Sequence, residues 1–90
     1  MSAPTFRRSE RALWRRAGVD VVAALPESDH VHVLTGGAGA VWWALEEPGT
    51  VEALVDDLAL SFDVAADALA TDVRVCLEDL LAIGLVEHES

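Results

Sequence analysis

One segment near the end of the chain, residues 66–86, constrains the fold more than any other. Its apolar side chains recur at spacings of three and four residues, which places them on one stripe of a helix. The stripe contains Leu69, Val73, Cys76, Leu77 and Leu80. Gly84 follows and supplies the left-handed residue that often ends a helix, after which Leu85 can fold back onto the last turn. The segment therefore predicts the longest helix of the chain and one face of its core.

The two flanks of this expected helix differ in chemistry. One flank carries Asp72, Val75 and Asp79, and the other carries Arg74, Glu78 and Leu81. A helix that buries an apolar stripe and keeps a flank of mixed carboxylates and apolar side chains can pack and bind a partner at the same time. The sequence therefore predicts a binding surface beside this helix.

The composition of the 90 residues indicates one small folded domain. A hydrophobic content of 52% is too high for a disordered chain, and this length is too short for a deep active-site cleft. No apolar run is long enough for a membrane span, and the N-terminus lacks the apolar segment of a signal peptide. The single cysteine, Cys76, excludes an internal disulfide, so we expect a cytoplasmic protein without a membrane partner.

The charge is unevenly distributed along the chain. The net charge is −10, there is no lysine, and five of the six arginines lie in the first sixteen positions. From Glu46 onward, twelve acidic residues stand against Arg74 alone. Such a surface repels the phosphates of nucleic acids and attracts a basic partner or peptide. The same charge also serves simple solubility, and charge alone leaves both explanations open.

The first third of the chain predicts a tail and a small sheet. Residues 1–10 are expected to form a mobile tail. Two short strands are predicted at residues 13–16 and 19–25, with a turn at Ala17-Gly18, because glycine permits a tight reversal. Residues 31–34 alternate in character and are rich in β-branched side chains, which indicates a third strand.

Two further helices are expected between the third strand and residue 66. The first covers about residues 38–46, and its buried face contains Ala38, Val41, Trp42 and Leu45. The second follows a break at Pro48-Gly49, with Thr50 as its N-cap and Glu52 in its first turn. Its buried stripe contains Val51, Leu54, Val55, Leu58 and Phe62. Three strands followed by three helices indicate an α+β domain.

The residue types that carry chemistry do not form a recognisable catalytic site. The glycines at 36, 37 and 39 lack the spacing of dinucleotide-binding loops and the Gly-Lys-Ser/Thr ending, so we ascribe them to close strand–helix packing. His30 and His32 share a strand face, but no third metal ligand is evident. Cys76 is expected to be a small core residue rather than a reactive thiol. We therefore expect no catalysis, no metal and no cofactor.

From about Leu13 to Val86 the chain resembles the PqqD-like family, also called RiPP recognition elements. These small domains hold the leader segment of ribosomally made, post-translationally modified peptides. The motifs that carry the resemblance are Val33-Leu34-Thr35-Gly36, Val41-Trp42 with Leu45, Thr50-Val51-Glu52-Ala53-Leu54, Phe62-Asp63-Val64, Asp72-Val73, Leu77, Leu80 and Gly84-Leu85-Val86. Their order and spacing, rather than any single motif, make the resemblance specific.

Two residues depart from the family's pattern. Cys76 stands where the family often has a larger apolar residue, which would widen a groove beside the third helix. Trp43 is an extra aromatic residue that points away from the buried face of its helix. Because a large exposed aromatic side chain is costly, Trp43 is either covered by the sheet or loops or marks a contact surface.

The resemblance implies a winged-helix-like fold, with a three-stranded antiparallel sheet packed on three helices, in a single peptide-recognition domain over residues 11–87. It also implies that a leader peptide adds as a fourth strand to the exposed edge of the third strand and lies against the third helix. In this mode main-chain bonds give affinity and side-chain pockets give specificity. The expected peptide-binding residues are Val31, His32, Val33, Leu34, Asp72, Val75, Cys76 and Asp79.

The resulting hypothesis is a non-catalytic protein that captures the leader of a precursor peptide by strand addition. It would present the precursor to a modifying enzyme such as a protease, a cyclase or a radical enzyme. A winged-helix nucleic-acid-binding regulator is one alternative, although its recognition helix would carry Arg74 among acidic side chains. A small acidic carrier protein is the other, although Ser61 lies near a helix end rather than at the helix start where a carrier is modified.

We expect the protein not to bind a defined DNA duplex or an RNA specifically at physiological salt. Acid-rich helices and the absence of lysine leave too little positive charge to offset phosphate repulsion. A gel shift carried from low to physiological salt measures this. Tight binding to a defined duplex at physiological salt would overturn the peptide-binding hypothesis.

Overall fold

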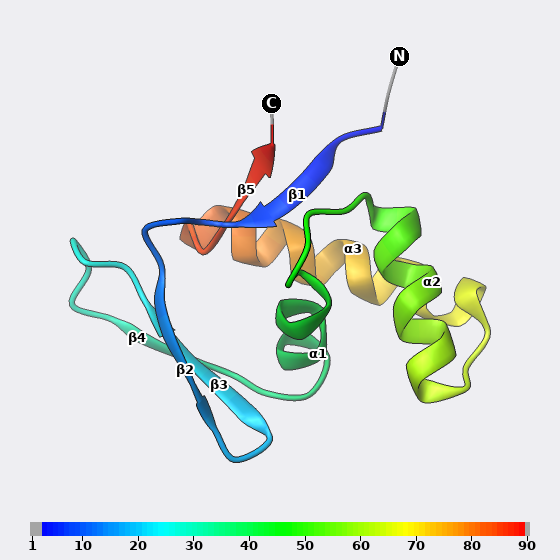
Figure 1. Cartoon of the computed structure of the whole chain (residues 1–90), viewed down its shortest axis with the longest axis horizontal. Coiled ribbons are helices and arrows are strands. Elements are labelled where there is room, and N and C mark those ends of the chain that lie inside the picture. The colour runs from blue at the N-terminus through cyan, green and yellow to red at the C-terminus, as the bar shows by residue number, and fades with distance from the viewer. Residues whose placement is uncertain (1–2, 90) are drawn as a thin grey trace.

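The computed structural model describes residues 3–89, which form two small sheets and a layer of three helices (Figure 1). The elements in chain order are β1 (Thr5–Arg8), β2 (Leu13–Ala17), β3 (Asp20–Ala24), β4 (Val31–Leu34), α1 (Gly36–Ala44), α2 (Val51–Phe62), α3 (Ala66–Ile83) and β5 (Val86–Glu89). The predicted α+β fold, with a three-stranded antiparallel sheet packed on three helices, is confirmed.

The larger sheet has the strand order β2–β3–β4, and both pairs of neighbours are antiparallel. Gly18 and Val19 form the two-residue loop between β2 and β3, and Gly18 takes a positive φ of 66°, which other residues rarely adopt. The predicted turn is therefore present, but it lies one residue later than the expected Ala17-Gly18, because Ala17 still pairs with Asp20 in the ladder. Val21 and Ala23 of β3 are buried and alternate with half-buried residues, so one face of the sheet meets the helices.

The three helices and the inner face of this sheet share one core. Trp42 of α1 and Leu77 of α3 are fully buried within it, and α2 packs on both of these helices. The core contains Phe6, Val21, Ala23, Leu34, Val41, Trp42, Leu45, Leu54, Val55, Leu58, Val73, Leu77, Leu80, Leu85 and Val86. Among the described strands and helices, β2 is the one element that contributes no buried side chain.

The helix ends follow the sequence signals. Thr50 caps α2, because its hydroxyl oxygen accepts a hydrogen bond of 3.1 Å from the Ala53 N–H. At the end of α3, Gly84 takes a φ of 96°, and the Leu85 N–H donates back to the Leu80 carbonyl at 3.0 Å, as in a Schellman motif. None of the helices in residues 3–89 is long and apolar enough to cross a membrane.

The prediction of a mobile tail over residues 1–10 was wrong for its second half. Thr5–Arg8 form β1, which pairs antiparallel with β5 near the C-terminus. Phe6 is 7% exposed, and its main chain exchanges hydrogen bonds with Gly49 at the start of α2. The domain therefore begins before residue 11 and continues to Glu89, while residues 1 and 2 lie outside the described part.

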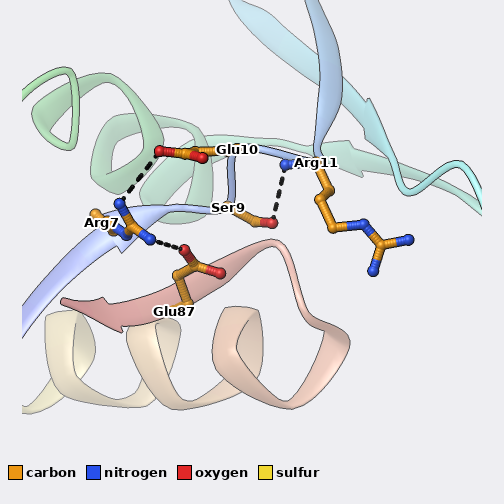
Figure 2. A network of polar contacts seen from close by, with 5 residues as sticks. All are labelled: Arg7, Ser9, Glu10, Arg11 and Glu87. Atoms are coloured by element: carbon orange, nitrogen blue, oxygen red, sulfur yellow. Dashed lines mark hydrogen bonds and ion pairs between the residues drawn. The ribbon is translucent and has the colours of Figure 1, made fainter. Parts of the chain in front are cut away.

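Polar contacts also fasten this N-terminal segment (Figure 2). Arg7 forms ion pairs with Glu10 and with Glu87 of β5. The hydroxyl of Ser9, which is itself buried, accepts a hydrogen bond of 3.2 Å from the Arg11 N–H. Exposed ion pairs of this kind contribute little one by one, so apolar burial in β1 is the larger stabilising term.

Some side chains of the predicted stripes lie nearer the surface than expected. Phe62 is 57% exposed because α2 ends there and the chain turns away at Asp63, whose φ is 53°. Leu69 and Cys76 are half-buried at the margin of the core. α1 begins at Gly36, two residues before the predicted start. The placement of Phe62 in the core was therefore wrong, and Leu69 and Cys76 belong to the core only in part.

We expect Leu77→Ala to lower the free energy of unfolding by about 2–5 kcal/mol, because Leu77 is fully buried on the central stripe of α3. This is a large share of the stability of a small domain. Urea denaturation followed by circular dichroism measures the change. Leu60→Ala is the matched control, since Leu60 is 83% exposed on α2 and its truncation should change stability by no more than about 0.5 kcal/mol. Equal midpoints for wild type and Leu77→Ala would contradict the register of α3.

Candidate functional site

The hydrogen-bonding direction of each strand in the larger sheet follows from the two-residue loop between β2 and β3. In such a hairpin, the residues that flank the loop, Ala17 and Asp20, exchange both N–H···O bonds. Bonded pairs then alternate with non-bonded pairs along the ladder. The main-chain groups of Val21 and Ala23 therefore point away from β2 and toward β4.

The same alternation decides which groups of β4 are free. The register sets Val21 and Ala23 opposite Leu34 and His32, so these two residues of β4 use their main-chain groups to bond β3. The N–H and C=O groups of the other two strand residues, at positions 31 and 33, point to the open edge of the sheet. The edge of β4 thus offers free donors and acceptors, which is what strand addition requires.

The side chains of β4 alternate between the two faces of the sheet. Leu34 is 5% exposed and packs in the core, and His32 on the same face is half-buried. Val31 and Val33 are 63% and 60% exposed, and their side chains lie on the face away from the helices. The assignment of all four residues to peptide contacts was therefore too broad for Leu34. Its side chain belongs to the core and its main chain bonds β3, so it holds the strand in place.

The first turn of α1 packs against the end of β4 and also against α3. A Cβ atom at Gly39 would lie 3.0 Å from the Leu34 carbonyl oxygen, so a larger residue would push helix and strand apart by a few tenths of an ångström. A Cβ atom at Gly37 would lie 3.8 Å from the Cys76 sulfur of α3. The predicted close packing of strand and helix is confirmed at Gly39 alone, since Gly37 faces α3 and a Cβ atom at Gly36 would have no neighbour within 4 Å, although Gly36 takes a positive φ of 53°. The side of α3 that carries Cys76 therefore faces the helix into which β4 leads.

An apolar hollow of about 110 Å³ lies on this side of α3. It is lined by Gly37, Ala40, Val41, Leu58, Phe62, Leu69, Asp72, Val73 and Cys76. Phe62 and Leu69 form part of its wall, which explains why both are more exposed than periodicity predicts. Asp72 is the charged member of the lining. The hollow therefore suits an apolar side chain that has a polar or basic neighbour.

The two flanks of α3 face different surfaces. Arg74 and Glu78 line a separate hollow of about 320 Å³, together with Phe6 of β1 and the start of α2. Asp72 and Cys76 line the hollow beside α1. Only the second of these flanks adjoins the helix that follows β4. The sequence alone did not decide between the flanks.

The remaining predicted residues of α3 are accessible. Asp72 and Asp79 are exposed, and Val75 is 49% exposed. Across residues 3–89, no hydrogen bond or ion pair joins these three side chains to β4. They are free to contact a ligand, and their assignment to peptide binding stays a prediction.

The thiol of Cys76 is kept in its protonated form. Burial raises the pKa of Cys76 above its ordinary value, and the carboxylates of Asp79 and Asp72 raise this pKa further because they disfavour a neighbouring thiolate. The thiolate is the nucleophilic form of cysteine. Cys76 therefore serves as a small, weakly polar part of the wall, beside the Cα of Gly37.

The chemistry available at this site is binding. Within residues 3–89, no three His, Cys, Asp or Glu side chains are placed to hold a metal ion. His30 is exposed and His32 is half-buried on β4. A free strand edge, an apolar hollow and exposed carboxylates are each features that suit the binding of an extended peptide.

Comparison with known proteins adds two findings. A family model described as "Coenzyme PQQ synthesis protein D (PqqD)" matches residues 20–86, well over half of the chain. A solved structure, "TbiB1 in Complex with the TbiA(beta) Leader Peptide", has a TM-score of 0.81 at 21% sequence identity and covers 93% of this chain and 98% of that one. Similarity to this structure shows a common fold. No curated protein sequence matches the chain.

We expect Cys76 to be alkylated more slowly in the folded protein than in the unfolded chain, with its half-maximal rate at higher pH. A raised pKa leaves a smaller thiolate fraction at any pH below it. Iodoacetamide labelling followed by mass spectrometry across neutral to alkaline pH measures this, with the chain in urea as the control. Asp72→Asn and Asp79→Asn should each move the midpoint toward lower pH. A native midpoint below that of the unfolded chain would contradict the environment described for this thiol.

Proposed function

The chain belongs to the PqqD family, and from that premise we propose that it is a non-catalytic protein that captures the leader of a ribosomally made precursor peptide by strand addition. The observation that carries the proposal is the open edge of β4, where the main-chain groups of Val31 and Val33 point outward. β4 leads directly into α1, whose residues Gly37, Ala40 and Val41 line the apolar hollow beside α3. The similar solved structure was determined with a leader peptide, as its title states, and this supports a peptide ligand here.

In this proposal the leader lies along β4 and bonds its free main-chain groups. Side chains of the leader alternate between the two faces of the sheet, and those on the helix side meet His32 and the exposed flank of α3. An apolar side chain fills the hollow beside Cys76 and contacts Val75. Basic side chains approach Asp72 and Asp79. The main chain thus supplies affinity that is independent of sequence, and the flank of α3 supplies selectivity for a leader with apolar and basic residues.

A leader held on β4 leaves the rest of the precursor free. We therefore propose that the complex presents the precursor to a modifying enzyme, such as a protease, a cyclase or a radical enzyme. No catalytic role is proposed for this chain, since its one cysteine is held as a thiol and its carboxylates are solvated or line a binding surface. A cytoplasmic location stays a prediction from the single cysteine.

The two alternative functions gain no support from the geometry. Arg74 lies in a hollow beside Glu78 rather than on a basic face of α3, whereas DNA-reading helices need a basic footprint. Ser61 lies in the last turn of α2 rather than at a helix start, where a carrier protein is modified.

We expect Val33→Pro to abolish leader binding or weaken it at least about tenfold while the fold persists. Proline removes an N–H that points to the open edge and leaves the ladder with β3 intact. Isothermal titration with the leader of a precursor encoded beside this protein's gene measures Kd, and a tenfold change corresponds to about 1.4 kcal/mol. Val33→Thr is the matched control because it keeps the N–H. Wild-type affinity in a folded Val33→Pro protein would show that the leader does not add to β4.

We further expect Asp72→Asn and Asp79→Asn each to raise Kd for a basic leader by up to about fivefold. Exposed charge pairs contribute up to about 1 kcal/mol, and salt should reduce the difference between wild type and variants. Arg74→Ala on the opposite flank of α3 is the control. Unchanged affinity in both Asn variants, together with a clear loss in Arg74→Ala, would place the groove on the opposite flank.

A further inference from the structure

The three-stranded sheet has a second free edge, on β2. By the same alternation that frees β4, the main-chain groups of Leu13, Arg15 and Ala17 bond β3, and those of Trp14 and Arg16 point outward. All five residues of β2 are exposed. An open edge strand with no cover is a place where another chain can pair.

Two tryptophans beside this edge are held in a fixed arrangement. Trp14 packs edge-on against Trp43, with ring centroids 5.4 Å apart, and against the buried Trp42 at 5.8 Å. The Cζ atom of Arg8 lies 4.6 Å from the Trp14 ring centroid, and its guanidinium donates two hydrogen bonds to the Trp42 carbonyl oxygen. Trp14 and Trp43 nevertheless stay 39% and 38% exposed. Ordered aromatic rings of this kind lose little freedom on binding and often anchor interfaces.

Trp43 also forms one wall of a hollow at the hairpin end of β2. The hollow has a volume of about 380 Å³ and is lined by Arg16, Gly18, Val19 and Trp43. Val19 at the tip of the hairpin is 89% exposed. We call the free edge of β2, with the side chains of Trp14, Arg16, Val19 and Trp43, the tryptophan edge. The sequence left open whether Trp43 is covered, and the structure covers it only in part.

The charge of the tryptophan edge is opposite to that of the chain as a whole. In the described part of the chain, Arg7 and Arg11 form ion pairs with carboxylates, whereas no carboxylate pairs with Arg15 or Arg16. The whole chain carries a net charge of −10. Charge complementarity therefore favours an acidic ligand here, in contrast to the basic leader proposed for β4.

We propose that the tryptophan edge binds an acidic, extended segment of a partner protein, which adds to β2 as a strand. The free main-chain groups of Trp14 and Arg16 bond the segment. Successive side chains of the segment alternate between the two faces of the sheet, so its carboxylates pair with Arg15 on the face away from the helices. Its apolar side chains lie on the helix side, where one of them packs on Trp43. The chemistry that identifies this partner is an alternation of carboxylates with apolar side chains.

The position of this edge allows both ligands to be bound together. β2 and β4 lie at opposite sides of β3, so a segment on β2 does not compete with a peptide on β4. A modifying enzyme that carries such a segment could dock on β2 while the precursor is held on β4. This simultaneous binding rests on the proposed function, whereas the binding of an acidic strand to β2 does not.

The test uses a synthetic peptide of alternating glutamate and valine residues with blocked ends, titrated into isotope-labelled protein and followed by NMR. We expect the amide signals of Trp14 and Arg16 and the indole N–H signal of Trp43 to shift, and those of Val31 and Val33 to stay. A lysine–valine peptide of the same length should cause no shift at β2. The same glutamate–valine peptide with methylated main-chain nitrogens should also fail to bind, because it cannot complete the ladder.

Charge reversal provides the second arm of the test. Arg15→Glu should weaken binding of the glutamate–valine peptide at least about tenfold, since an attraction becomes a repulsion. Arg74→Glu makes the same charge change on α3 and should leave Kd unchanged. Unfolding midpoints of both variants confirm that the fold persists, and leader binding at β4 should be retained in each.

Three results would overturn the inference. The first is peptide-induced shifts at Val31 and Val33 instead of β2, and the second is equal affinity of wild type and Arg15→Glu. The third is self-association of the protein that covers Trp43, which would make a second copy of the chain the occupant. Failure of the leader to bind would refute the proposed function and leave binding at β2 unaffected. Loss of glutamate–valine binding with leader binding intact would refute this inference alone.

Discussion

Burial of the α3 stripe is the interaction on which the other features depend. Val73, Leu77 and Leu80 bind α3 to the core, and this packing sets the rotation of the helix about its own axis. One flank, with Arg74, is thereby turned toward β1 and α2, and the other, with Cys76, is turned toward α1. A long helix that buries a narrow stripe cannot bury its flanks as well. The exposed mixed flank is therefore a direct consequence of the packing, and it lies beside α1, the helix into which β4 leads.

A second constraint comes from the length of a single loop. The two-residue connection between β2 and β3 closes the ladder on a bonded pair, and this parity decides the direction of the main-chain groups throughout the sheet. It frees positions 31 and 33 on one edge and positions 14 and 16 on the other. The side chains follow the same period of two, so Leu34 and Val21 enter the core while Val33 faces solvent. If the bonded and non-bonded pairs of the hairpin were exchanged, different main-chain groups would be free at the edges and different side chains would face the core.

The parts of the fold that could be predicted from the sequence are those decided by near neighbours. The α3 stripe, the Thr50 cap and the turn at Gly18 each depend on residues within one or two turns of the chain. β1 could not be predicted, because its partner β5 lies at the other end of the chain and its short sequence has one buried side chain, Phe6, beside two arginines. The strand and the helix flank of the candidate site were predicted with the help of a family resemblance. The apolar hollow was not predicted. It is formed by residues of three helices, α1, α2 and α3, and the periodicity of one helix carries no information about where other helices pack against it.

A domain of this size has no room for a deep cleft, and sheet edges offer it a different way to bind. An edge strand supplies main-chain donors and acceptors and needs no cleft. Both edges of a three-stranded sheet can therefore bind an extended chain. Main-chain hydrogen bonds do not depend on the sequence of the ligand, so selectivity has to come from the side chains beside each edge. Here those side chains differ in sign: Asp72 and Asp79 are exposed on the flank of α3 proposed for the leader, and Arg15 and Arg16 lie on β2. Under the two proposals, each edge repels the ligand that suits the other, and the uneven charge of the chain then directs each ligand to its own edge.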